Sequence, residues 1–139
     1  MVHALHEAWR ILRPQGILID LRPLCADAPL EIVFTGGCDS AGPVEMNLGI
    51  AHENAADHAI ESVTGEGIFK ELELDHFDFA FYWNTVKEMK AEINEYWQDD
   101  AVLRPDVLRR AAARFKKRHA QAQVRLRVPM KLAKFEKQS

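Results

Sequence analysis

Leu5-His6-Glu7-Ala8-Trp9-Arg10-Ile11-Leu12-Arg13-Pro14-Gln15-Gly16-Ile17-Leu18-Ile19-Asp20-Leu21-Arg22-Pro23 is the stretch that decides the fold. Apolar residues recur at helical spacing up to Leu12, which gives residues 2–12 one apolar face. Pro14 cannot continue a helix, and Gly16 permits a sharp turn. The apolar run at residues 17–21 then predicts a strand buried on both faces, as in a parallel sheet. The stretch therefore predicts an αβ unit of a three-layer α/β protein.

A β-hairpin is predicted between residues 30 and 50. Residues 30–35 are rich in β-branched and aromatic side chains, and residues 44–50 alternate weakly, so both segments predict strands. The cluster at residues 36–43 predicts a long turn. Its Gly36-Gly37 pair is also a candidate phosphate cradle, but no glycine-rich phosphate motif surrounds it and no helix begins directly after it. We favour the hairpin turn.

Helices are predicted at residues 51–64, 85–98 and 105–120, and strands at residues 69–83 and 122–135. Thr85 and Glu88 have the spacing of a capping box at the start of one helix. Pro129 removes a ladder donor from the last strand and predicts an edge position or a bulge. An aromatic stripe shares one face of the strand at 69–83, and we interpret it as core: Phe77, Phe79, Phe81 and Trp83.

The opening stretch resembles the segment of class I S-adenosylmethionine-dependent methyltransferases that runs from the helix after the fourth strand into the fifth strand. The family pattern is Glu-x-x-Arg, an apolar residue, Leu, Lys or Arg, Pro, Gly, Gly and an apolar strand. Gln15 departs from it, because the family usually has Gly there. The alternative is any α/β protein with a similar helix-to-strand junction. This chain carries the pattern as Glu7, Arg10, Ile11, Leu12, Arg13, Pro14, Gln15 and Gly16.

The resemblance implies a fold class: α/β, with a truncated Rossmann-like methyltransferase sheet of mixed strand direction. It implies an antiparallel last strand, helices packed on the sheet and residues 30–50 as an inserted hairpin. Residues 1–139 are expected to be a single domain similar to the C-terminal half of the family. The family's first three strands build its cofactor site, with a glycine-rich turn after the first strand. Those strands have no counterpart here, so we expect no catalytic residue and no bound cofactor.

We therefore expect a non-catalytic methyltransferase-like domain that acts by self-association or by binding a protein partner. One alternative is the C-terminal half, or a subunit, of a split methyltransferase that another chain completes. A second alternative is a nucleic-acid-binding module that uses a basic surface. Finding a separate chain that carries the cofactor half would support the split methyltransferase. A steep salt dependence of binding would support the nucleic-acid-binding module.

A homodimer is expected because the strand at residues 17–21 would lack one neighbour of the full family sheet. An open strand edge and unburied apolar groups usually mark a contact surface, and two-fold pairing would cover both copies. The rival arrangement folds the 30–50 hairpin over the open edge. The candidate interface residues are Trp9, Ile11, Ile17 and Ile19.

Charge is divided unevenly along the chain. From Arg104 onward there are twelve Lys and Arg residues and two acidic ones, against six and nineteen before it. Such asymmetry can mark nucleic-acid binding, but a basic end can also pack beside acidic segments, within one chain or across a dimer. We favour the second interpretation and expect no sequence-specific nucleic-acid recognition. The predicted outward basic surface is Arg109, Arg110, Arg114, Lys117 and Arg118.

Cysteine, histidine and hydropathy patterns predict no metal site and no membrane segment. Cys25 and Cys38 have no CxxC or Cys/His cluster around them, which fits a reducing, cytoplasmic location. His52 and His58 are six residues apart and point to different sides of the predicted helix. No apolar stretch reaches about 18 residues. Charged and histidine residues interrupt the N-terminus, so no signal peptide is expected.

Overall fold

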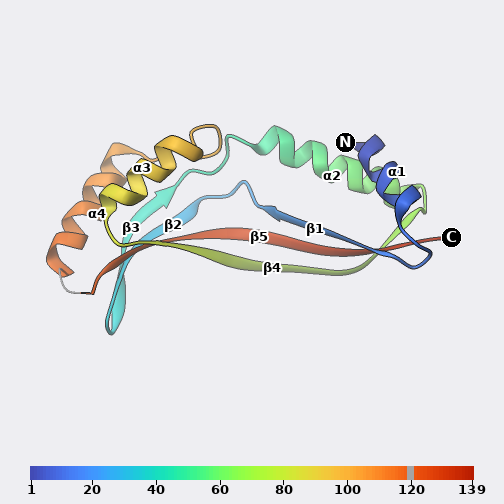
Figure 1. Cartoon of the computed structure of the whole chain (residues 1–139). Helices are drawn as coiled ribbons and strands as arrows, with labels where there is room; N and C mark the ends of the chain where they lie inside the picture. Colours follow the sequence, from blue (N-terminus) through green and yellow to red (C-terminus); the bar gives the residue numbers. More distant parts are fainter. Residues whose placement is uncertain (119–120) are drawn as a thin grey trace. The chain divides into compact units, whose positions relative to one another are not determined.

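The computed structural model describes residues 1–118 and 121–139 (Figure 1). The protein is α/β, with an open, mostly antiparallel five-stranded sheet and four helices in the described part of the chain. The predicted strand at 69–83 is confirmed with the same bounds, whereas the predicted helix end at Ala120 lies outside the described residues. The elements are α1 (Val2–Ile11), β1 (Ile17–Pro23), β2 (Ala28–Phe34), β3 (Gly37–Val44), α2 (Ile50–Gly65), β4 (Phe69–Trp83), α3 (Val86–Tyr96), α4 (Pro105–Arg118) and β5 (Gln123–Lys137).

The last strand, β5, is the one with which most other strands pair. β1 pairs antiparallel with residues 130–136 of β5, and β2 pairs antiparallel with residues 123–126. β3 continues the sheet beside β2, and β4 also pairs with β5. Pro129 falls between the two stretches of β5 that pair with β1 and β2, where its missing N–H breaks neither ladder. The predicted antiparallel direction of the last strand is confirmed.

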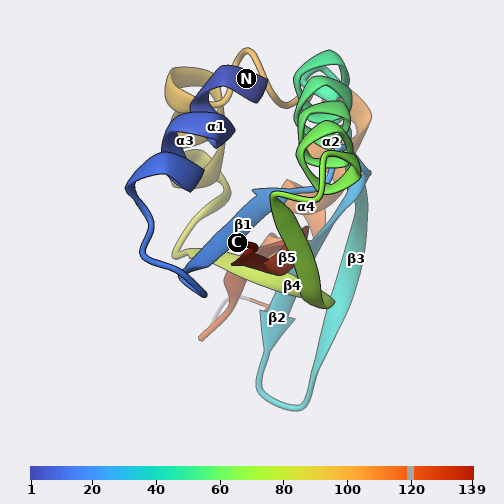
Figure 2. The ribbon, with the colours of Figure 1, turned by 90° about the vertical axis from the view of Figure 1, so that its right-hand side faces the viewer.

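The chain divides into two compact units. Unit 1 comprises Met1–Leu24, Ile50–Phe77 and Met130–Ser139, and unit 2 comprises Cys25–Gly49 and Asp78–Pro129. In unit 1, α1 and α2 lie on the same side of the strands (Figure 2). Its core is a cluster of buried side chains from α2, β4 and β5, against which α1 and Leu18 of β1 pack: Val63, Phe69, Ala133 and Phe135.

A tight turn joins α1 to β1 in unit 1. The N–H of Gly16 donates to the carbonyl of Arg13 at 2.8 Å, so Pro14 and Gln15 are the two central residues. Gln15 has a φ of 60°, which is a left-handed conformation. Gly or Asn usually occupies the third position of a turn with this conformation. A Cβ on Gly16 would lie 2.7 Å from the carbonyl oxygen of Arg13, so this position needs glycine.

Strand β1 differs from the prediction of a strand buried on both faces. It pairs antiparallel with β5, and its side chains are alternately exposed and half-buried. Ile17 is 40% exposed, Ile19 53% and Leu21 54%. The prediction is wrong because α1 and α2 pack on the face of Leu18, which leaves the odd-numbered side chains on the other face.

The hairpin of unit 2 also differs from its prediction. β2 and β3 are joined only by Thr35 and Gly36, so residues 36–43 are mostly strand rather than a long turn. The predicted strand at 44–50 is wrong beyond Val44, because Ile50 already begins α2. Weak strand formers in β3 are held by the β2 ladder and by α4, whose Arg110 Nε donates to the carbonyl of Ala41 at 2.9 Å.

The aromatic stripe of β4 is core only at its end in unit 2. Trp83 is buried, and the rings of Phe81 and Trp97 meet edge to face with centroids 4.8 Å apart. Phe79 is 50% exposed and Phe77 39%, so the core interpretation is wrong for these two residues. The predicted cap of α3 is confirmed, since the Thr85 hydroxyl accepts from the N–H of Glu88 at 3.1 Å.

Candidate functional site

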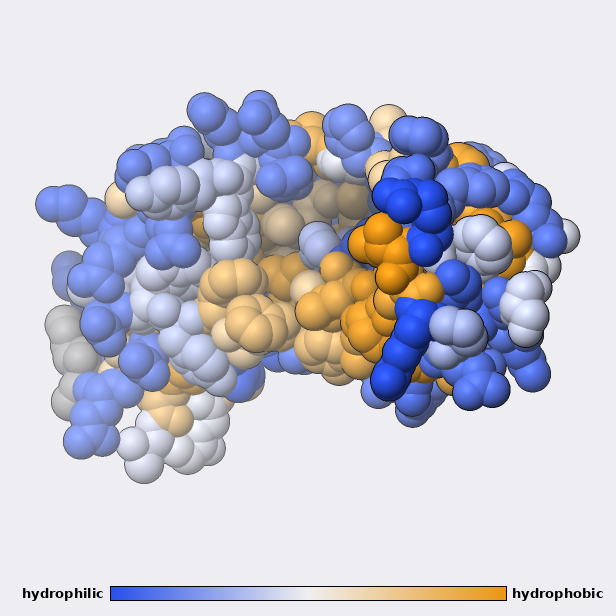
Figure 3. All heavy atoms as spheres, turned by 45° about the vertical axis from the view of Figure 1, so that its right-hand side comes forward, coloured by the Kyte–Doolittle hydropathy of each residue, from blue (hydrophilic) through white to orange (hydrophobic). Residues whose placement is uncertain are grey.

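Apolar side chains line the face of unit 1 that lies opposite α1 and α2. Phe69 points into the core, so strand alternation places Leu72 and Leu74 on the other face of β4. In β1, Leu18 packs against the same core, and alternation places its neighbours Ile17 and Ile19 on the other face. Their exposed fractions are 45% and 46%, similar to those of β1. Apolar residues gather on the surface shown in Figure 3. We use the name open face for the surface formed by Ile17, Ile19, Leu21, Leu72 and Leu74.

Strand register completes the open face with residues of β5. Leu21 lies opposite Leu132, Ile19 opposite Lys134, and Ile17 opposite Glu136. One cation and one carboxylate thus sit two positions apart beside the apolar side chains. Exposed apolar clusters of this kind, rimmed by polar groups, usually mark a surface that contacts another molecule.

Strand β1 also ends the sheet on its side. In the described part of the chain its strand partner is β5 alone, so the other edge of β1 has unpaired backbone N–H and C=O groups. Unpaired edges are templates for pairing with another strand. The strands of the 30–50 hairpin pair with each other and with β5, and among the described residues neither pairs with β1.

The four interface candidates fall in different surroundings. Ile17 and Ile19 lie together on the open face, and Ile11 is 72% exposed on α1. Trp9 packs against the unit 1 core, its Nε1 donates to the carbonyl of Gln138 at 3.2 Å, and the Lys137 ammonium lies 4.4 Å from the ring centroid. Sequence reasoning missed Leu72 and Leu74, although their alternation with acidic residues in β4 was the signal for an exposed strand.

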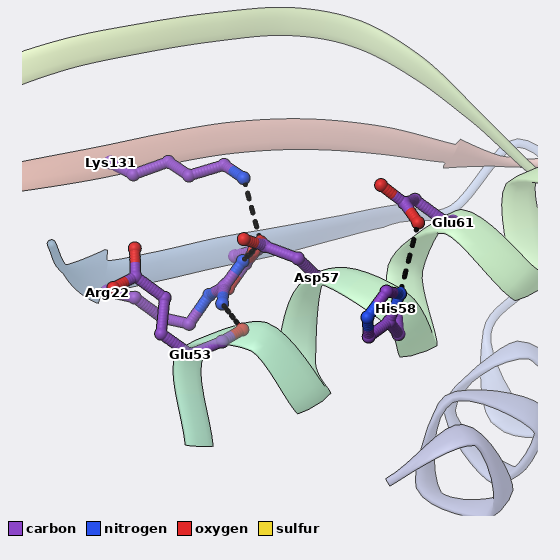
Figure 4. A network of polar contacts seen from close by, with 7 residues as sticks. Arg22, Glu53, Asp57, His58, Glu61 and Lys131 are labelled. Atoms are coloured by element: carbon purple, nitrogen blue, oxygen red, sulfur yellow. Dashed lines mark hydrogen bonds and ion pairs between the residues drawn. The ribbon is translucent and has the colours of Figure 1, made fainter. Parts of the chain in front are cut away.

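An ion-pair network occupies the helix-facing side of unit 1 (Figure 4). Arg22 Nη2 lies 2.7 Å from Asp57 Oδ1 and 2.8 Å from Asp20 Oδ2. Lys131 Nζ lies 3.0 Å from the same Asp57 oxygen, and Arg22 Nη1 donates to the carbonyl of Glu53 at 3.3 Å. The network therefore ties α2 to both β1 and β5.

Electrostatics keep the carboxylate of this network ionised. The hydrogen bond from Arg22 lowers the pKa of Asp57, burial raises it in part, and Lys131 lowers it further, so the pKa lies below its ordinary value. A general acid or base works best with a pKa near the operating pH. Asp57 is thus suited to holding α2 in place and not to proton transfer at neutral pH.

An open concavity of about 740 Å³ adjoins this network in unit 1. Ile60 and Thr64 of α2 line it on one side, and Phe69 and Glu71 of β4 on another. Lys131 contributes from β5, with its ammonium already paired to Asp57. The lining mixes apolar, acidic and basic groups and thus suits polypeptide side chains of mixed chemistry.

The predicted basic surface on α4 is only partly available. Arg110 donates to the carbonyl of Ala41, Arg114 to that of Ser40, and Arg118 pairs with Asp39 at 3.1 Å, so three cations hold β3 of their own chain. Arg110 and Arg118 are nevertheless exposed, and Arg114 is half-buried. Arg109 and Lys117 are exposed. Three of the five cations thus already have partners in their own chain.

The basic end of the chain does pair with earlier acidic segments, as predicted. Glu31 is 7% exposed and accepts from Arg125 and Arg127, and Arg127 also pairs with Asp78 at 3.0 Å. Burial by itself raises the pKa of Glu31, but the hydrogen bonds and charges of the two arginines outweigh it and lower the pKa. Sequence reasoning missed Glu31 because only the register of β2 with β5 reveals its partner.

No group of three or more His, Cys, Asp or Glu side chains within residues 1–118 and 121–139 could hold a metal ion. Among the same residues, no helix is both long and apolar enough to cross a membrane. Comparisons of the chain with protein-family models, with curated proteins and with solved structures find no significant match. The geometry of unit 1 is therefore the basis for a functional proposal.

Proposed function

We propose that this chain is a non-catalytic, methyltransferase-like domain that self-associates as a homodimer through the open face of unit 1. The observation that carries the proposal is the apolar sheet face opposite α1 and α2, whose five side chains are 40% to 54% exposed. Two copies would bury ten such half-exposed side chains, a gross gain of roughly 10 kcal/mol at about 1 kcal/mol each. That gain is comparable with the roughly 4–15 kcal/mol cost of association, so a dimer of moderate affinity is expected.

Charge on β5 favours a second copy as the occupant of the open face. Lys134 makes no ion pair within the described residues, and Glu136 lies two positions further along the same face. A two-fold axis makes every contact twice, so Lys134 of one copy can meet Glu136 of the partner subunit in both directions. A self-complementary pattern of this kind suits a homodimer better than an unrelated protein.

Methyltransferase ancestry rests on the opening stretch, with two supporting observations. The last strand runs antiparallel to the strand of the opening stretch, as the family resemblance implies. Gln15 adopts a left-handed φ at the position where the family usually has Gly. The non-catalytic assignment rests on the sequence, since no Gly-x-Gly-x-x-Gly turn that could hold the cofactor occurs in it.

Light scattering of the protein from about 1 to about 100 micromolar tests the dimer, because half-dissociation is expected in this range. Leu21→Lys places a charge on the open face and should yield a monomer across the range. Leu48→Lys is the matched control, because Leu48 is 50% exposed in unit 2 and should leave the dimer intact. A monomeric wild-type protein, or equal effects of the two variants, would contradict the proposal.

The unpaired edge of β1 favours a second candidate, a subunit of a split S-adenosylmethionine-dependent methyltransferase. A strand from another chain could pair along that edge and bring a cofactor site with it. A calorimetric titration with S-adenosylmethionine separates the two proposals when it is run with the chain alone and then with the chain and its completing subunit. No binding by the chain alone is expected in either case, and saturable micromolar binding by it would contradict the non-catalytic assignment.

A further inference from the structure

The opposite edge of the unit 1 sheet is formed by β4, whose outer side pairs with no strand among the described residues. The carbonyl of Ile68 accepts from the N–H of Gln138 at 2.9 Å, so Ile68 directs its backbone toward β5. Alternation along an antiparallel strand then directs the N–H and C=O groups of Glu71, Glu73 and Asp75 away from β5. Within the described residues, β5 is the one strand with which β4 pairs.

The same three residues give the free edge a negative charge. Their side chains share the face of Phe69 and are exposed. Glu71 and Glu73 form no ion pair or hydrogen bond among the described residues, and Asp75 accepts only from the adjacent N–H of His76, at 2.8 Å. Glu71 also lines the open concavity beside α2, so side chains approaching from this edge have space to enter.

The paired edge of β4 shows which strand chemistry suits it. β5 alternates basic and apolar residues, with the sequence QVRLRVPMKLAKFEK. In unit 2 one of these cations, Arg127, already forms an ion pair with Asp78 of β4. Opposite charges on neighbouring strands are stabilising, whereas like charges directly opposite are not. A second copy of β4 would place acidic residues against acidic residues, so it fits the free edge poorly.

We propose that the free edge of β4, at residues 69–77, binds an extended segment of another protein in which Lys or Arg alternates with apolar residues. The segment adds one strand to the sheet, with main-chain hydrogen bonds to Glu71, Glu73 and Asp75. Its cations lie beside the three carboxylates, and its apolar side chains lie beside Leu72 and Leu74 on the other face. The main-chain pairing uses the edge of β4, so this proposal does not rest on the homodimer proposed above, although Leu72 and Leu74 adjoin both surfaces.

Fluorescence anisotropy with a labelled, end-blocked peptide of about nine residues, in which Lys alternates with Val, tests this site. Saturable binding to the wild-type protein is expected, and a peptide of alternating Glu and Val should not bind. Glu73→Gln and Glu73→Pro both remove the charge, but only proline also removes the N–H on the free edge. Glu73→Pro should therefore bind the Lys-Val peptide at least tenfold more weakly than Glu73→Gln.

Proline is tolerated on strand edges, and thermal unfolding of each variant checks that the fold is kept. A Lys-Val peptide that is N-methylated at alternate residues gives a second measurement with the unaltered protein. Methylation of the residues whose N–H groups face β4 should abolish binding. Methylation of the residues in between should leave binding intact. Equal binding by the two variants, equal binding by both methylated peptides, or binding of the Glu-Val peptide would overturn the proposal. Loss of the wild-type dimer in Glu73→Pro would also overturn it, because a second copy would then occupy this edge.

Discussion

The guanidinium of Arg22 and the carboxylate of Asp57 lie 2.7 Å apart and link β1 to α2 across 35 positions of the chain. Lys131 shares the same carboxylate oxygen from β5, so one acidic group neutralises cations from two neighbouring strands. Arg22 is 19% exposed, which makes its charge costly to leave without a partner. The contact therefore fixes α2 over the strands more firmly than a surface ion pair would.

Asp57→Asn should lower the free energy of unfolding by about 1–3 kcal/mol, because Lys131 loses its carboxylate partner and Arg22 keeps only that of Asp20 in the described part of the chain. Urea unfolding followed by circular dichroism measures the change. Glu61→Gln is the control, since Glu61 is on the same helix but is 74% exposed and, among the described residues, forms its ion pair with His58 alone. Its effect should stay below about 0.5 kcal/mol. Equal effects of the two substitutions would mean that the network is not structural.

Acid should destabilise the protein through Asp57 and Glu31, whose folded-state pKa values both lie below their ordinary values. A depressed pKa means that the unfolded state binds more protons, so stability is present above the unfolded pKa of about 4 and is lost as pH falls through the folded pKa. The urea midpoint is expected to decline from about pH 5 downward. Asp57→Asn and Glu31→Gln should each flatten this decline. An unchanged slope in both variants would assign the acid response to other groups.

Two substitutions at the interface candidates should act in different ways. Ile19→Lys should yield a folded monomer with little loss of stability, because Ile19 is 53% exposed. Trp9→Glu should destabilise unit 1 at every protein concentration, by about 3 kcal/mol or more, because Trp9 packs against the core. Light scattering and urea unfolding of the same samples separate dissociation from unfolding. A folded, dimeric Ile19→Lys variant would place the interface elsewhere.

Adding a glycine to the turn between α1 and β1 and removing the glycine already there should have different effects on stability. Gln15→Gly should leave stability unchanged or raise it by up to about 1 kcal/mol, because a left-handed φ costs a non-glycine residue about 1–2 kcal/mol. Gly16→Ala should lower stability, since its Cβ would lie 2.7 Å from a backbone oxygen. Thermal unfolding midpoints measure both. Loss of stability in Gln15→Gly would show that the Gln15 side chain has a role of its own.

Local signals in the sequence were sufficient to predict most helices and strands, but they did not predict how the strands pair or which of their faces are exposed. The Pro14 break, the Thr85 cap and the alternation of residues 69–83 depend on neighbouring residues, and these predictions are confirmed. The exposure of β1 depends on which face the helices of unit 1 cover, and an apolar run alone does not encode this. β3 was missed because its strand formation depends on β2 and α4 rather than on its own residues.

The candidate site was predicted in part for the same reason. Ile17 and Ile19 were identified from the missing neighbour strand of the family pattern, and the structure places them together on the open face. Leu72 and Leu74 join them only through the pairing of β4 and β5, over more than 50 positions of sequence. Arg110, Arg114 and Arg118 have the helical phase of a surface stripe. Because α4 packs against β3, the first two instead bond backbone carbonyls of β3 and the third pairs with the Asp39 side chain.

The pairing of β5 with β1, β2 and β4 has a consequence for synthesis on the ribosome. Residues 123–137 are translated after all of their strand partners, so none of these three pairings can form before they emerge. Until then the nascent chain carries unpaired strands with apolar faces, which is the kind of species that aggregates. The sheet therefore cannot form before β5 emerges, and until then the nascent chain depends on chaperones or on rapid synthesis of β5 more than a chain with local pairings does.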